Sequence, residues 1–400
     1  MDAYWLDWAN LLLRWAHVIT AIAWIGSSFY FVMLDNSLTK PEHEDLLAKG
    51  VDGEMWAVHG GGFYHSNKYM VAPRWRPLPQ NLHWSYWESY STWLTGFALF
   101  TVLYLFNAGS FLIDRTVFDW PAAAAIAASL GFLVAFWLVY DGICRTLGQG
   151  AKGDLIVAGA VLAFVVFASW LACQLFAGRA AFLLVGAMLA TAMSANVFFV
   201  IIPGQKKVVA ALRAGQEPDP LHGRRGKQRS VHNTYFTLPV IVAMLSNHYG
   251  WLYQGEHNWI VLVLLMAAGA LIRHSFVARH KAHVQGRRAP WAHAVAGTLL
   301  LVGLAIWLAP PPRPAAAVQA PVTWPAVQAV LAQRCLVCHN AQVQNKNVAL
   351  HTPELVRQHA QAVFQQVAVL RLMPMNNATQ ITEAERDLIR RWYEAGAPTR

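Results

Sequence analysis

Long apolar stretches recur at regular intervals over the first three quarters of the chain, separated by short polar segments. Each has about 20 residues or slightly more, the length that crosses a hydrocarbon core of about 30 Å as a helix. The stretches lie near residues 8–34, 84–107, 121–144, 154–176, 180–202, 232–253, 258–279 and 291–309. The pattern predicts an all-α fold in which residues 1–309 form an eight-helix transmembrane bundle.

A different pattern follows this region. Residues 310–321 are mainly proline and alanine, which favours extended polyproline II and predicts a semi-rigid linker. Residues 322–400 are polar and amphipathic, and they are expected to form a small helical domain that needs a stabiliser besides its core. Its three predicted helices cover Trp324–Arg334, Pro353–Leu370, and the segment from the capping box Thr382–Glu385 to Gly396.

Composition agrees with a membrane location. Hydrophobic residues make up 56% of the chain and charged residues only 13%, against roughly 25% charged in soluble domains. The net charge of +10 does not indicate a nucleic-acid partner, because most Lys and Arg residues lie in the short segments between apolar stretches. There they set the orientation of the protein in the membrane.

The positive residues are distributed unevenly between alternate loops. The loops after the first, third, fifth and seventh stretches contain Lys40, Lys49, Lys68, Arg74, Arg76, Arg145, Lys152, Lys206, Lys207, Arg213, Arg224, Arg225, Lys227, Arg229, Arg279, Lys281, Arg287 and Arg288. The loops after the second, fourth and sixth contain only Arg115 and Arg179. The odd-numbered loops are therefore expected to face the cytoplasm, with both termini on the opposite side.

Two of the four cysteines belong to a motif with a known chemistry. Cys335-Leu336-Val337-Cys338-His339 has the spacing of c-type haem attachment, in which two thiols add to the haem vinyl groups and the adjacent His ligates iron. A structural zinc site would need a second ligand pair, and a redox CxxC normally lies in a βαβ pattern. Neither is visible, so the motif predicts covalent haem c bound by Cys335, Cys338 and His339.

A sixth ligand for the haem iron is expected downstream. Met373-Pro374-Met375 follows His339 in a stretch without helical pattern, and a thioether is the usual sixth ligand in low-spin cytochromes c. We assign Met373, which precedes the proline, as the sixth ligand. Met375 is the competing candidate, and if it is not the ligand it packs against the porphyrin edge.

Titratable residues inside the apolar stretches are candidates for function, because burying them in lipid is costly. Arg14 lies close enough to the outer end to extend to the headgroups. His17 lies deeper, and it either ligates a b-type haem between helices or hydrogen-bonds a neighbouring helix. His248 and His274 raise the same question.

The loop after the first stretch contains His59-Gly60-Gly61-Gly62-Phe63-Tyr64-His65. Glycines allow a backbone to approach a ligand closely, while the flanking His and aromatic residues offer proton transfer and a flat stacking surface. The alternative is a tight interfacial turn beside an aromatic belt.

Several segments together resemble one family. They are Asn10-Leu11-Leu12-Leu13-Arg14-Trp15-Ala16-His17, Trp24-Ile25-Gly26-Ser27-Ser28-Phe29, the HGGGFYH loop, Leu82-His83-Trp84 and Trp93-Leu94-Thr95-Gly96. The chain is similar over its whole length to the bacterial membrane-bound urate oxidase (urate hydroxylase) family, whose members join an eight-helix membrane domain to a C-terminal cytochrome c.

This resemblance implies oxidation of urate to 5-hydroxyisourate, with electrons passed to the cytochrome and the respiratory chain rather than to oxygen as peroxide. It also implies a bacterial inner-membrane location with a periplasmic cytochrome domain. The reaction removes two electrons and adds a hydroxyl from water, so the site needs a base and a donor that stabilises an anion. The candidates are His59 or His65 as base, Lys68 or Arg74 for the anion, and Trp56, Phe63 or Tyr64 for stacking.

The expected distance between the two sites is a difficulty for this hypothesis. A cytoplasmic loop and an external haem are separated by about 30 Å of hydrocarbon. Either a haem b held by His17 and another intramembrane His lies between them, or a cavity carries the substrate inward. A further option is a metal site built from His83, His232, His274, His280, His283 and His293.

Two functions from other classes remain open. The protein could be a quinol-linked cytochrome that carries electrons without a urate site, or a transporter with a redox sensor. Seven helices beyond the single span that an anchor needs argue against the first, and so does the aromatic, glycine-rich loop.

Overall fold

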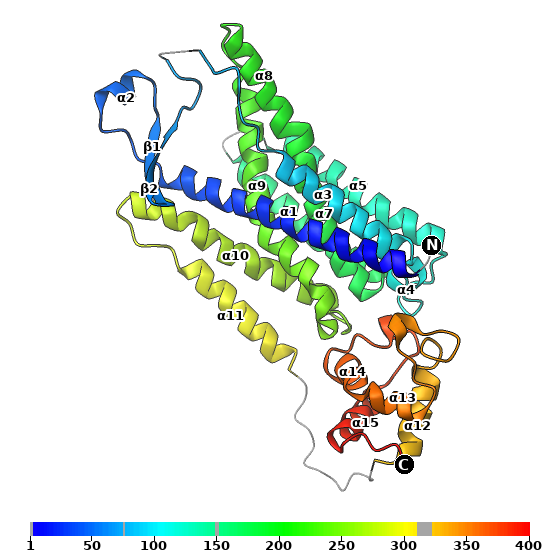
Figure 1. Cartoon of the computed structure of the whole chain (residues 1–400). Helices are drawn as coiled ribbons and strands as arrows, with labels where there is room; N and C mark the ends of the chain where they lie inside the picture. Colours follow the sequence, from blue (N-terminus) through cyan, green and yellow to red (C-terminus); the bar gives the residue numbers. More distant parts are fainter. Residues whose placement is uncertain (1–2, 75–76, 149–151, 310–321) are drawn as a thin grey trace.

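Helices form most of the structure, a computed structural model that describes residues 3–74, 77–148, 152–309 and 322–400 (Figure 1). The predicted linker 310–321 and Arg76 lie outside the described residues. The long helices of the first part are α1 (Ala3–Ser37), α3 (Trp87–Phe100) with the π-helical η1 (Thr101–Leu105), α5 (Ala122–Thr146), α6 (Gly153–Leu175), α7 (Gly178–Ala195) with the π-helical η2 (Asn196–Ile201) and α8 (Ile202–Arg213), α9 (Pro220–Leu245), α10 (Asn258–Val284) and α11 (Ala292–Trp307).

Five helical stretches among the described residues are long and apolar enough to cross a membrane. They are Tyr4–Ser37, Ala122–Thr146, Gly153–Leu175, Gly178–Arg213 and Asn258–Val284. The other three predicted spans overlap α3 with η1, α9 and α11, which are shorter or more polar. That these three also cross the membrane stays a prediction.

The sixth predicted span is displaced from its observed helix. It was expected over residues 232–253, but α9 covers Pro220–Leu245, and short 3₁₀ turns follow it. The helix begins early because Asp219 accepts a hydrogen bond from the Leu221 N–H at 2.8 Å and Pro220 occupies the first turn. The polar residues that looked like a loop are therefore helical, and Arg229 lies inside α9.

One segment corrects the all-α prediction. β1 (Gly53–His59) and β2 (Gly62–Lys68) form an antiparallel hairpin, preceded by the short helix α2 (Glu44–Ala48). Gly60 and Gly61 form the two-residue turn with φ of +61° and +80°, a conformation that glycine adopts readily. The glycines of the HGGG motif thus make a tight turn, the alternative that the sequence had left open.

Apolar side chains from α5, α6, α7 and α10 form the core of the first part. α7 is its most buried helix, and Leu184, Val185 and Met188 are sealed from solvent. Small residues allow close packing here: a Cβ added at Gly186 would lie 2.9 Å from Ala243 on α9. α9 packs between α7 and α10, so polar groups on α9 are held inside the bundle.

The C-terminal unit has its own core, which includes Val327, Leu331, Val356, Ile389 and Trp392. Its helices are α12 (Trp324–Arg334), α13 (Pro353–Gln358), α14 (Ala360–Phe364) with the π-helical η6 (Gln365–Val369), and α15 (Glu383–Glu394). The predicted first helix is confirmed, as are the capping box at the start of α15 and the turn at Gly396, whose φ is +87°. The predicted middle helix is broken into shorter pieces.

The C-terminal unit contacts the bundle at the end that holds the N-terminus (Figure 1). Asn376 donates a hydrogen bond to the Ser110 carbonyl at 2.7 Å, and Gln254 donates to the Arg371 carbonyl. Leu372 packs against the core of the first part, and Lys346 pairs with Asp7. The hairpin lies at the opposite end of the bundle.

Candidate functional site

The CxxCH motif follows α12 directly, and Cys335 is the C-cap residue of that helix. The Cys338 and His339 N–H groups both donate to the Cys335 carbonyl at 3.1 Å, which holds the motif in a turn. Cys338 is exposed and Cys335 is partly buried. Burial, with Cys338 and Glu385 nearby, raises the pKa of the Cys335 thiol to about 11.

His339 is oriented by a backbone group. Its Nδ1 lies 3.0 Å from the Val348 carbonyl, so Nδ1 is the protonated donor and Nε2 is left as a ligand atom. Two free thiols with an oriented imidazole beside an apolar core are the donor set that covalent haem c requires. The residues present therefore fit this group.

The two candidate methionines have different surroundings. Met373 packs against the core of the C-terminal unit, and its carbonyl accepts a hydrogen bond from Arg386 at 2.9 Å. Met375 begins the 3₁₀ turn η7 (Met375–Asn377), which lies against α4 (Ala108–Phe111) in the first part of the chain. Placement in the same core as the motif favours Met373, which stays the predicted ligand.

The hairpin does not bring the candidate catalytic residues His59, Tyr64, His65 and Lys68 together on one face. In an antiparallel pair, opposite residues share a face and neighbours along a strand alternate. The register pairs His65 with Trp56 and places His59, Tyr64 and Lys68 on the other face. The predicted set is therefore divided between two faces.

Several of these side chains are already paired. His65 Nε2 lies 2.5 Å from the Glu54 carboxylate, and its ring stacks on Trp56 with centroids 4.1 Å apart. Lys68 forms an ion pair with Asp35 at 2.6 Å, which ties β2 to the last turn of α1. His59 lies beside the turn and is exposed.

His17 forms hydrogen bonds to the neighbouring helix, one of the two alternatives for it. Its Nδ1 lies 3.1 Å from the Thr92 carbonyl and 3.2 Å from Thr95 Oγ1, both on α3. The imidazole packs on Gly96, where an added Cβ would lie 2.7 Å from its Cε1. A haem b held by His17 stays a prediction.

The histidines suggested for a metal site do not come together as a cluster among the described residues. Within the parts of the chain that the structure describes, no three His, Cys, Asp or Glu side chains gather as metal ligands would.

Sequence analysis missed a buried polar network between α5, η2 and α9. Arg229 is only 2% exposed, and its Nη2 pairs with the Asp141 carboxylate at 2.7 Å. The Asn196 amide donates to Tyr140 Oη and to Asn233 Oδ1, each at 3.0 Å. Arg229 had been counted as a loop charge, although Asp219-Pro220 is a helix-start signal that would have placed it inside α9.

A second buried arginine lies between α1, α9 and α10. Arg273 is 3% exposed, and its guanidinium carbon lies 3.6 Å from the centre of the Phe29 ring. Nearby, Tyr235 Oη lies 2.7 Å from His274 Nδ1, and the His274 and His293 rings are 4.4 Å apart.

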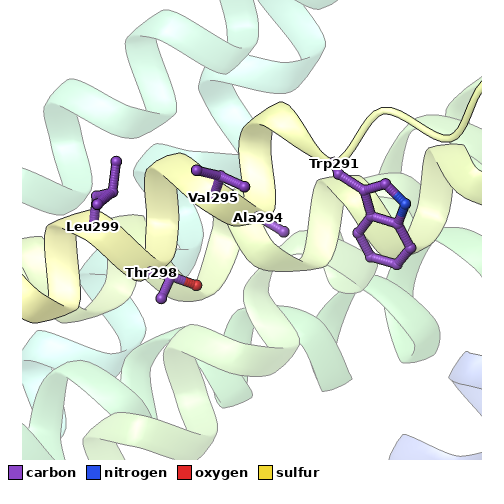
Figure 2. Close-up of a pocket in the computed structure, with 5 residues that line it drawn as sticks. All are labelled: Trp291, Ala294, Val295, Thr298 and Leu299. Carbon is purple, nitrogen blue, oxygen red and sulfur yellow. The ribbon is translucent and has the colours of Figure 1, made fainter.

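Two surface pockets lie near the ends of α10 and α11. A basic pocket of about 410 Å³ is lined by Arg279, His280, His283, Arg287 and Ala289. The second, of about 340 Å³, is shallow, and all its lining residues belong to α11 or directly precede it (Figure 2). It offers too few polar groups for an anionic substrate.

The comparisons with known proteins give one result. Residues 3–309, well over half of the chain, match the family described as Urate oxidase N-terminal. The chain belongs to this family. Membership indicates urate-related oxidation by an oxidoreductase, and the apolar helices are compatible with a membrane protein. No curated protein and no solved structure matches the chain.

Proposed function

We propose that this protein is a membrane-bound urate oxidase that converts urate to 5-hydroxyisourate and delivers the electrons to its own C-terminal cytochrome unit and then to the respiratory chain. One observation carries the proposal: the urate oxidase region and the Cys335–His339 motif belong to one chain, and the segment around Met373 contacts the helical bundle. A shared chain gives the donor and acceptor sites a high effective concentration for each other.

The C-terminal unit would hold haem c covalently through the Cys335 and Cys338 thiols, with His339 and Met373 as the residues that would bind its iron. Bound haem c supplies one-electron redox chemistry. The hydrogen bond from His339 to the Val348 carbonyl would hold the imidazole in its ligating orientation. An additional haem b at His17 remains a proposal for bridging the membrane.

The oxidation takes up one water and releases two protons and two electrons for each urate, so the urate site needs a proton acceptor. His59 and His65 remain the candidates on the hairpin, with Tyr64 for stacking and Lys68 for the anion. The geometry favours His65 as the oriented base, because Glu54 holds its ring as a carboxylate holds a catalytic imidazole. Because Lys68 is already paired with Asp35, it is less available to stabilise an anionic form of urate.

The arrangement of the chain also supports a periplasmic cytochrome unit in the bacterial inner membrane. The N-terminus and the C-terminal unit lie at one end of the bundle, while the hairpin and the basic pocket at the end of α10 lie at the other. The lysine- and arginine-rich loops predict the same arrangement, with the hairpin on the cytoplasmic side and both termini on the opposite side.

The test is anaerobic turnover by the purified, haem-loaded protein with ferricyanide as final acceptor. We expect loss of urate, two ferricyanides reduced for each urate, and incorporation of ¹⁸O from labelled water into the product. In air, no stoichiometric peroxide should form. Urate that stays unconsumed while added quinol reduces the haem would instead identify a quinol-linked electron carrier.

A further inference from the structure

One edge of the Arg273 guanidinium group has no hydrogen-bond partner among the described residues of the bundle. Its Nε and Nη2 are sealed from water, and neither has a hydrogen-bond partner among the described residues. These two nitrogens form one side of the guanidinium fork, the side that binds a carboxylate or another flat anion through two parallel hydrogen bonds. A buried charge without a counter-ion is costly, so this edge points to an anion that is bound during function.

The groups around this edge suit a planar ligand that exchanges protons. Phe29 covers one face of the Arg273 guanidinium, so a flat anion on the Nε–Nη2 edge would lie alongside an aromatic ring. Tyr235 on α9 is hydrogen-bonded to His274, the residue that follows Arg273 on α10. His274 contacts His293, which is exposed, so the chain of side chains connects the buried site to the surface.

The basic pocket lies on α10, the same helix as Arg273. His280 lines this pocket and lies seven residues after Arg273 on α10, which places both on one helix face about 10 Å apart along the axis. The positive groups at the pocket would raise the local concentration of a negatively charged substrate. The Nε–Nη2 edge is closed to water, so side chains must move before an anion can bind there. Phe29 covers the guanidinium, and its side chain is 39% exposed.

We propose that the Nε–Nη2 edge of Arg273 binds the urate monoanion, which reaches it through the basic pocket of Arg279, His280, His283 and Arg287, and that Tyr235, His274 and His293 conduct protons between this site and the surface. The inference rests on the proposed function. It keeps the proposed reaction but places urate at α10 within the bundle instead of at the hairpin, which lies at the end of the bundle away from the C-terminal unit.

The experiment measures binding of radiolabelled urate to the full-length protein with its haem reduced by dithionite, so that urate binds without being oxidised. Arg273→Gln should weaken binding about 10- to 100-fold, the effect of losing hydrogen bonds to a charged group. Arg273→Lys, which keeps the charge but not the fork, should fall between. Lys281→Gln removes an exposed charge from the same helix outside the pocket and should bind as the wild type does.

A second readout is the KM for urate in turnover, which should rise in Arg273→Gln and Arg273→Lys but not in Lys281→Gln. Haem content and gel filtration establish that each variant is folded. If both Arg273 variants bind urate as tightly as the wild type and have the same KM, this inference is wrong and the proposed function is unaffected. If wild-type protein neither binds urate nor transfers electrons from it, the proposed function itself fails, and the inference with it.

Discussion

At the scale of residues, Asp141 has the clearest structural role in the bundle. It accepts from Arg229 at 2.7 Å and from Arg145 at 2.6 Å, and Arg229 is almost fully enclosed. Removing one partner of a buried ion pair leaves the other charge uncompensated, at a cost of about 3–5 kcal/mol. Asp141 therefore anchors the polar network between α5 and α9.

Replacing Asp141 by Asn should accordingly lower the midpoint of thermal unfolding in detergent by several degrees, followed by tryptophan fluorescence. Asp119→Asn is the matched control, because Asp119 pairs with Arg115 at 3.5 Å on the surface and both side chains are largely exposed. Such surface pairs contribute at most about 1 kcal/mol. Equal midpoints for the two variants would contradict the assigned role of Asp141.

The two cysteines of the motif should react at different rates in the haem-free chain. At pH 8, a thiol whose pKa is raised to about 11 is ionised in only about one molecule in a thousand, and the thiolate is the reactive form. Iodoacetamide should therefore modify exposed Cys338 at least about ten times faster than Cys335, as measured by peptide mass spectrometry. The difference should disappear in denaturant, and a folded chain in which both react equally would refute the burial of Cys335.

Part of the candidate site could be predicted from the sequence. The motif at Cys335–His339 could be recognised because its ligand spacing is local in sequence, and the haem c that it indicates stays a prediction. The network around Arg229 could not be read directly, because its partners Asp141 and Asn196 come from helices far away in the chain. The pairing of His65 with Glu54 depends on hairpin register, which the glycine-rich motif alone does not reveal.

At the scale of elements, the hairpin turn gives a sharp test. Gly61 has a φ of +80°, where a β-branched residue is strained by roughly 1–2 kcal/mol, whereas Gly62 lies outside this region with open space around its Cβ. Gly61→Val should therefore loosen the hairpin and raise hydrogen exchange over residues 53–68. Gly62→Val should leave exchange unchanged, and an equal response to both changes would argue against the turn.

Helix positions could be predicted where a long apolar stretch marks the whole helix. The bounds of α5, α6 and α10 lie close to the predicted spans for this reason. The bounds of α9 were not predicted because its first half is polar and is mostly exposed or half-buried, so hydropathy does not mark it as part of the helix. The hairpin was missed because its turn residues were interpreted as a ligand loop rather than as a connection between two strands.

At the scale of the whole molecule, contact between the C-terminal unit and the bundle should govern electron transfer between them. A Cβ at Gly250 would lie 2.7 Å from the Leu370 carbonyl, so Gly250→Ala must push the two units apart locally. We expect slower haem reduction by urate in stopped-flow measurements, with an unchanged haem spectrum. Gly255→Ala, where the space is open, is the control and should behave as the wild type does.

This contact was beyond sequence analysis, because it joins Ser110 and Gln254 to a segment more than one hundred residues later. The sequence predicts a membrane part joined to a small helical unit, and the two separate apolar cores are compatible with that division. It also placed both termini at one end, the arrangement seen in Figure 1.

The central claim is that urate oxidation and the cytochrome unit are coupled in one chain. An anaerobic difference spectrum of the oxidised, detergent-purified protein before and after addition of urate tests it most directly. The account predicts that urate alone produces the α-band of reduced haem c, and that a b-type band appears as well if His17 holds a second haem. If dithionite reduces the haem and urate does not, the account is contradicted.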